Sequence, residues 1–121
     1  MYALTTIGIT VGYHRLFAHK AFRTSTTIKI ILAILGCMSG QGHLIHWVSN
    51  HRRHHQNCDL RGDPHSPHVS LDGKKFNTLD GFWHSHISWL VTGDFPNILL
   101  AKDWLKDSAL VKVNRLYLVW V

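Results

Sequence analysis

The sequence contains few cysteines, and the two that it has, Cys37 and Cys58, form no CxxC pair. Two isolated cysteines cannot form a disulfide framework, and they exclude a cysteine-rich zinc site. No secretory signal peptide is expected, because the first residues lack a charged start and a small-residue cleavage site. The chain also has no internal repeat and no low-complexity tract. Its 121 residues are therefore treated as one small domain, residues 1–121.

Long apolar runs are also missing, since a bilayer-spanning helix needs about 20 consecutive apolar residues. Residues 1–17 are apolar but too short, and they could form the second half of a span. Residues 28–48 begin apolar and carry four polar side chains in their second half. That density of polar groups predicts a helix that is partly buried in protein or lies at a membrane interface. A buried helix of a soluble domain remains the alternative.

The rest of the chain alternates between polar and apolar stretches. Residues 51–81 are polar and contain Gly-Asp-Pro and Ser-Pro turn signals, which predicts an exposed loop after a short helical entry. Residues 82–91 are aromatic and amphipathic. Residues 102–121 begin charged and end apolar, as in an interfacial helix that leads into a membrane span. Because both ends lie in apolar runs, we expect a fragment of a longer, all-α chain.

The net charge is +6 and the isoelectric point is about 9.7. Lysine and arginine lie mainly in the polar segments beside the apolar ones, which fits the cytoplasmic side of a membrane under the positive-inside rule. A soluble nucleic-acid-binding protein is the competing explanation of this charge.

The 11 histidines are the unusual feature of the composition, because histidine is the commonest metal ligand in proteins. One cluster reads HRRHH and contains His51, His54 and His55. Residues three and four apart share one face of a helix, so these three side chains should point the same way. Arg52 and Arg53 should point away from them, toward solvent or lipid headgroups.

A second cluster contains His14 and His19, which are about 140° apart around an ideal α-helix. They converge only if His19 lies past the end of the helix. Five imidazoles exceed the needs of one zinc ion and suggest two metals, and redox chemistry favours iron or copper. No glutamate lies within either cluster, unlike in soluble di-iron bundles. A zinc-binding or nucleic-acid-binding module without catalytic activity remains the alternative.

Three stretches of the sequence are similar to the membrane fatty acyl desaturases of the stearoyl-CoA desaturase type, and most similar to the bacterial acyl-lipid and acyl-CoA enzymes. They read GITVGYHRLFAHKAF, WVSNHRRHHQNCDLRGDPHSP and GFWHSHISWL. The resemblance implies an integral membrane bundle of helices under a cytosolic cap. It further implies that two iron ions (Fe²⁺) at the cytosolic face use O₂ to introduce a cis double bond into a saturated acyl chain during unsaturated fatty acid biosynthesis.

The resemblance also assigns roles to individual residues. The metal ligands would be His14, His19, His51, His54 and His55. Gln41 and Trp47 would line the acyl tunnel, and no catalytic residue is expected beyond the ligands. The partners would be an acyl-CoA or acyl-lipid substrate, the membrane, and an electron donor such as ferredoxin or a cytochrome b5-type protein, with no nucleic acid.

The sequence departs from this family in several ways. The third histidine box is absent, so the chain is expected to be inactive alone. The HVSLDGKKFNTLD stretch is longer than in the animal enzymes, and TGDFP at residues 92–96 replaces their Arg-Lys pair. The acyl carrier therefore stays open among CoA, a lipid and acyl carrier protein. Asn50, Asp59 and Asp63 are candidate hydrogen-bond partners of the ligand imidazoles. The other histidines are expected to be structural or to support the ligands: His43, His46, His65, His68, His84 and His86. A membrane di-iron fatty acid or sterol hydroxylase is the alternative function.

Overall fold

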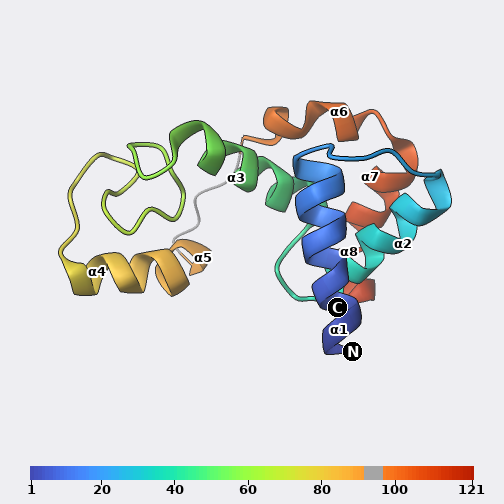
Figure 1. Ribbon diagram of the computed structural model, residues 1–121, viewed down its shortest axis with the longest axis horizontal. Helices are drawn as coiled ribbons and strands as arrows, with labels where there is room; N and C mark the ends of the chain where they lie inside the picture. Colours follow the sequence, from blue (N-terminus) through green and yellow to red (C-terminus); the bar gives the residue numbers. More distant parts are fainter. Residues whose placement is uncertain (92–96) are drawn as a thin grey trace. The chain divides into compact units, whose positions relative to one another are not determined.

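The computed structural model describes residues 1–91 and 97–121 (Figure 1), so the TGDFP stretch at residues 92–96 lies outside the described residues. The chain divides into two compact units, one made of Met1–Ser49 with Asn97–Val121 and the other of Asn50–Pro96. Within the described ranges the regular structure is helical, apart from a single bridge between Val69 and Lys75. The predicted all-α class is therefore confirmed.

The first unit begins with α1 (Tyr2–Ile7), which continues directly into the π-helix η1 (Gly8–Ala18). The remaining helices of this unit are α2 (Thr26–Cys37), the first part of α3 (Leu44–Asn57), the short 3₁₀ helix η3 (Ile98–Ala101), α6 (Lys102–Leu105), α7 (Ser108–Arg115) and α8 (Tyr117–Trp120). The side chains of Ser25 and Asp107 cap the N-termini of α2 and α7. Such caps satisfy backbone N–H groups that a helix leaves without partners.

The helices η1 and α2 approach each other closely at glycine residues. A Cβ atom on Gly8 would collide with the backbone of Leu35 and Gly36, and a Cβ on Gly36 would collide with the Tyr13 ring. This contact lies in the hydrophobic core of the first unit. The core consists of Tyr13, Leu16, Phe17, Ala18, Leu32, Ala33, Cys37, Leu44, Ile45, Val48, Ala101, Leu110 and Val113.

The single helix expected over residues 28–48 is wrong, because the chain turns between α2 and α3. Gly40 and Gly42 adopt φ angles of 73° and 101°, which residues with side chains rarely accept. An N–H group at the start of α3 has its hydrogen-bond partner in another helix of the first unit. The Ile45 N–H group donates to Oδ1 of Asn114 in α7 at 2.9 Å.

The second unit contains the end of α3, a loop over residues 58–77, α4 (Thr78–Trp83), the short π-helix η2 (His84–Ser88) and α5 (Trp89–Val91). The loop is organised by buried polar groups. The Ser66 hydroxyl is buried and accepts hydrogen bonds from the His68 and Val69 N–H groups. Gly81 packs against the carbonyl of Pro67, where a Cβ would not fit.

Residues 102–121 form three short helices, α6, α7 and α8, where the sequence pattern predicted one interfacial helix leading into a span. Across the described ranges, no helix combines the length and the apolar character required to cross a lipid bilayer.

Candidate metal centre

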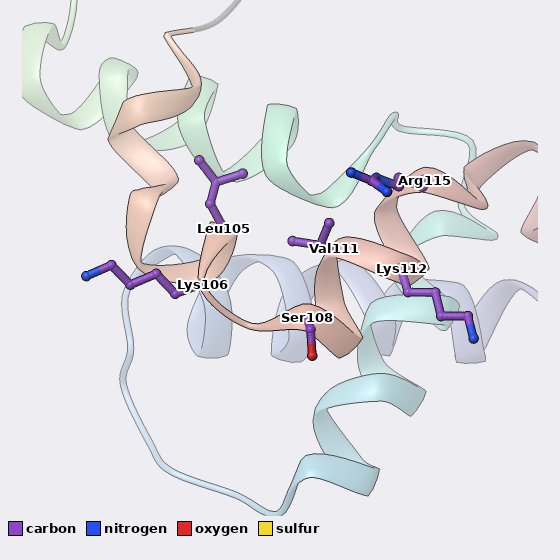
Figure 2. Close-up of a pocket in the computed structure, with 6 residues that line it drawn as sticks. All are labelled: Leu105, Lys106, Ser108, Val111, Lys112 and Arg115. Carbon is purple, nitrogen blue, oxygen red and sulfur yellow. The ribbon is translucent and has the colours of Figure 1, made fainter.

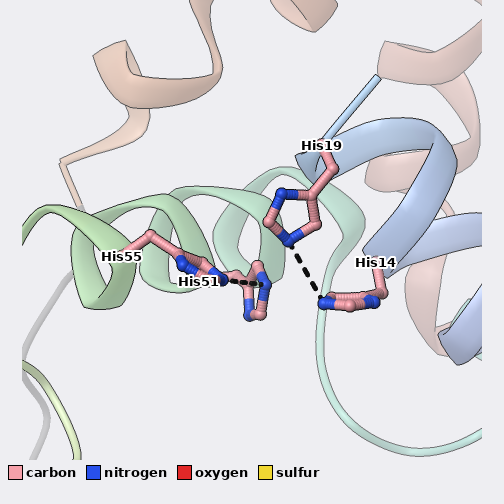
Figure 3. Close-up of side chains that lie close together, drawn as sticks. All are labelled: His14, His19, His51 and His55. Carbon is pink, nitrogen blue, oxygen red and sulfur yellow. Dashed lines mark hydrogen bonds between the residues drawn. The ribbon is translucent and has the colours of Figure 1, made fainter. Parts of the chain in front are cut away.

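The side chains of His14 and His19 meet at the end of η1. Their Nε2 atoms are 3.2 Å apart, and the rings lie 4.6 Å apart at nearly right angles (Figure 3). The His19 N–H group donates to the carbonyl of His14 at 3.0 Å, which is the i to i+5 bond of a π-helix. The wider π turn therefore brings together two residues that an ideal α-helix would separate.

The second pair, His51 and His55, occupies one face of α3. These residues are one α-helical turn apart, and their Nε2 atoms are separated by 3.1 Å (Figure 3). Their ring centroids are 4.6 Å apart. The predicted convergence of these two side chains follows from ordinary α-helical spacing.

The spacing within each pair fits two ligands of one metal ion. First-row metals bind imidazole nitrogen at about 2.0–2.1 Å, so two nitrogens on one ion lie roughly 3 Å apart. The Nε2 separations of 3.2 Å and 3.1 Å agree with this value. Neutral imidazole suits iron, zinc and copper, so this donor set is compatible with the expected iron.

The ring of His54 has a different environment from those of His51 and His55. Its Nδ1 atom lies 2.9 Å from Oδ2 of Asp63, in the loop of the second unit. Its ring centroid is 6.3 Å from that of His51 and 5.5 Å from that of His55. His54 is thus near the pair but is held by a carboxylate, as imidazole ligands of metals commonly are.

Asp63 is completely buried, and its carboxylate accepts several hydrogen bonds. The Asp59 N–H group donates to Oδ2 at 2.9 Å, and the His65 N–H group donates to Oδ1 at 3.1 Å. Burial alone would raise the pKa of Asp63, but these N–H groups and the His54 ring outweigh it, so the pKa lies below its usual value. The carboxylate is therefore ionised at neutral pH.

His65 stacks on His54, with ring centroids 4.4 Å apart and planes inclined by 28°. The ring of Trp89 in α5 lies 5.3 Å from that of His65. Burial, followed by the effect of nearby His54, lowers the pKa of His65, which favours its neutral form. Together, His54, Asp63 and His65 form a group whose ligand atoms lie within 4.8 Å of one another.

The sequence suggested three candidate hydrogen-bond partners for the imidazoles, and the structure shows a different role for each. Asp63 contacts His54, whereas Asp59 contributes its backbone N–H group to Asp63. Asn50 has a buried Oδ1 atom without a hydrogen-bond partner in the described part of the chain. Sequence reasoning did not predict that His65 stacks on His54. The sequence feature that could have indicated it is the turn motif that contains both Asp63 and His65.

Arg52 and Arg53, which were expected to face outward, are each partly buried. The predicted tunnel residues Gln41 and Trp47 lie together in the first unit. The indole N–H of Trp47 donates to Oε1 of Gln41 at 3.2 Å, and its ring lies 5.5 Å from that of Tyr13. Trp47 is therefore held by one polar contact and one aromatic contact.

A shallow pocket of about 520 Å³ opens on the first unit between α6 and α7 (Figure 2). Its lining residues are Leu105, Lys106, Ser108, Val111, Lys112 and Arg115. Three of them are cations and none is acidic, so the pocket is suited to a negatively charged group.

These features define a helical protein with histidine groups that could hold a metal ion. No family model matches the chain. A hex-5-enoyl-(acyl-carrier protein) acetylenase from Moorena producens is 51% identical over 123 residues, which cover 100% of this chain and 38% of that protein. A chloroplastic palmitoyl-monogalactosyldiacylglycerol delta-7 desaturase from Arabidopsis thaliana is 44% identical over 69% of this chain and 20% of its own length.

An acyl-CoA Delta(11) desaturase from Choristoneura rosaceana is 37% identical over 78% of this chain and 25% of its own length. The chain belongs to the fatty acid desaturase family. It spans between 20% and 38% of the length of these three relatives.

Proposed function

We propose that the protein containing this chain is a fatty acid desaturase that uses O₂ and two iron ions to introduce a cis double bond into a saturated acyl chain. The proposed role is unsaturated fatty acid biosynthesis. The observation that supports this most directly is the pairing of the motif histidines, with ring nitrogens 3.2 Å apart in one pair and 3.1 Å apart in the other. Membership of the desaturase family supports the same proposal.

Five imidazoles of this chain would hold the iron: His14, His19, His51, His54 and His55. Bound iron would supply the O₂-dependent removal of hydrogen from a methylene group, which has no acidic proton for a general base to take. The chain's own residues then have three tasks: to hold neutral imidazoles by their ring nitrogens, to keep water from the reacting carbon, and to fix which carbon faces the metals.

Gln41 and Trp47 would perform the last of these tasks as part of the acyl tunnel. A tryptophan offers a rigid apolar wall, and its N–H group is already satisfied by Gln41 at 3.2 Å. The relatives are named for different acyl carriers, namely acyl-carrier protein, a galactolipid and CoA. We infer an acyl-CoA or acyl-lipid substrate for this protein.

The remaining parts of the proposal concern the surroundings of the site. We infer an integral membrane protein whose active site faces the cytoplasm, with a ferredoxin or cytochrome b5-type protein as electron donor. The cationic residues beside apolar segments support this orientation. A membrane di-iron hydroxylase is the second candidate, because it would use a similar histidine-rich site.

Metal and product analysis of the full-length protein in detergent tests the proposal. We expect close to two iron ions per chain, and an acyl product that has lost two hydrogens in mass spectrometry. His14→Ala and His51→Ala should each lower the iron content and abolish product, because each removes one member of a ligand pair.

His68→Ala is the matched control, since His68 lies exposed in the loop of the second unit, and it should retain both iron and activity. A product that has gained oxygen would instead identify a hydroxylase. Bound zinc without iron would contradict both candidates.

A further inference from the structure

Asp63 is the only charged side chain that is fully buried among residues 1–91 and 97–121. A buried carboxylate is costly unless it is hydrogen-bonded, so its partners indicate why it is there. Two of its hydrogen bonds come from backbone N–H groups, of Asp59 at 2.9 Å and of His65 at 3.1 Å. The remaining close contact, at 2.9 Å, is with Nδ1 of His54.

The direction of this last hydrogen bond follows from the others. Oδ1 accepts from the His65 N–H group and Oδ2 accepts from the Asp59 N–H group, so both oxygens act as acceptors. Nδ1 of His54 must then carry the hydrogen and donate it to Oδ2. In a neutral imidazole with hydrogen on Nδ1, the lone pair available for a metal is on Nε2.

Among the described residues, no other contact holds the His54 ring as Asp63 does. Its Nε2 atom lies 4.0 Å from Sγ of Cys58, which is too long to orient the ring. The stacked ring of His65 covers one face of His54 at 4.4 Å but forms no hydrogen bond that selects a tautomer. Asp63 is thus the group that fixes both the rotation and the protonation pattern of this imidazole.

We propose that Asp63 is a positioning residue that holds His54 with hydrogen on Nδ1 and its Nε2 lone pair directed to the metal centre. This inference rests on the proposed function, in which His54 is an iron ligand. In this proposal Asp63 acts on the metal centre through His54 and not as an iron ligand, because Oδ2, the oxygen nearest the ring, already faces both the Asp59 N–H group and Nδ1 of His54.

The substitution Asp63→Asn tests the inference with little change of shape. The side-chain carbonyl of asparagine can still accept a backbone N–H, but its amide group would place a donor opposite Nδ1 of His54. The histidine would then carry its hydrogen on Nε2, where it cannot bind a metal. Loss of such an outer partner typically lowers metal affinity about 10–100-fold.

The metal-free full-length protein in detergent is titrated with Fe²⁺ under anaerobic conditions, and bound metal is measured. Co²⁺ is used in parallel, because its visible absorption reports the ligands around it. Asp63→Asn should bind Fe²⁺ about 10–100-fold more weakly than the wild type and show an altered Co²⁺ spectrum.

Asp59→Asn is the matched control, because Asp59 contacts the site through its backbone, and asparagine tolerates its φ of 58°. It should bind both metals like the wild type. If Asp63→Asn fails to fold, Asp63→Ser, whose hydroxyl still accepts one N–H group, should show the same loss of affinity.

Wild-type affinity and an unchanged Co²⁺ spectrum in a folded Asp63 variant would overturn the inference. A second outcome would also overturn it. If Asp63→Asn weakens Fe²⁺ binding as much in a His54→Ala background as in the wild type, Asp63 acts independently of His54. Failure of the wild-type protein to bind iron would instead reject the proposed function, so the two failures are distinguishable.

Discussion

The histidines of the two clusters are chemically alike in the sequence but differ in their local partners. His14 and His19 contact each other through Nε2, and so do His51 and His55. His54 instead uses Nδ1 to reach a buried carboxylate. An imidazole binds a metal through whichever ring nitrogen has a free lone pair. These contacts indicate which nitrogen that is, and the spacing of the histidines in the sequence does not.

The clearest prediction for a single residue concerns Trp47. Trp47→Ala should lower kcat/KM for the acyl substrate roughly tenfold, because the substitution removes a large apolar wall. Trp47→Phe, which keeps an aromatic ring but loses the hydrogen bond to Gln41, should have a smaller effect. Product formation and iron content are measured on the same preparations. Loss of iron in Trp47→Ala would show that Trp47 supports the metal centre and not the substrate path.

The helices show where sequence reasoning succeeded and where it did not. The spacing of His51 and His55 was sufficient to predict that both lie on one face of a helix, because α-helical periodicity is a local property. His14 and His19 were expected to converge only if His19 lay past the end of the helix, and His19 does follow Ala18, the last residue of η1, although the π-helical winding itself was not predicted. Asp63 was named as a candidate partner of the imidazoles, but its particular contact with His54 depends on the turns over residues 58–63 that bring it back to α3, and the sequence pattern does not determine that path.

At the level of helix packing, Gly8 should be essential to the contact between η1 and α2. Gly8→Ala places a Cβ against the backbone of Leu35 and Gly36, which cannot move aside as a flexible side chain would. Overpacking of this kind typically costs about 1–3 kcal/mol of stability.

Thermal unfolding of the full-length protein in detergent measures this effect as a lower Tm. Thr10→Ala, on an exposed position of the same helix, is the control and should change stability by about 0.5 kcal/mol or less. Equal Tm values for Gly8→Ala and the wild type would show that the two helices can separate without cost.

For the chain as a whole, the described part combines an apolar first unit with a second unit organised by polar groups. The buried hydrophobic residues all lie in the first unit, whereas Asp63 and Ser66 are buried in the second. The apolar runs and the family resemblance predicted the helical class, and the composition contains an excess of positive charge. The composition did not predict that Lys106, Lys112 and Arg115 would line one pocket, because this depends on the turn that places Lys106, after α6, beside the Lys112 and Arg115 of α7.

This pocket leads to a prediction about lipids. In the described part of the chain no acidic side chain pairs with Lys106, Lys112 or Arg115, so an anionic phospholipid headgroup should bind there. Added phosphatidylglycerol should raise the Tm of the full-length protein in detergent by roughly 2–4 °C more than phosphatidylcholine does.

Replacing the three cations by alanine should remove this difference, and high salt should weaken it. Lys74→Ala with Lys75→Ala, which removes two exposed cations of the loop in the second unit, should preserve it. Equal stabilisation by the two lipids in the wild type, or loss of the difference in the loop variant as well, would show that only the general positive charge of the protein is involved.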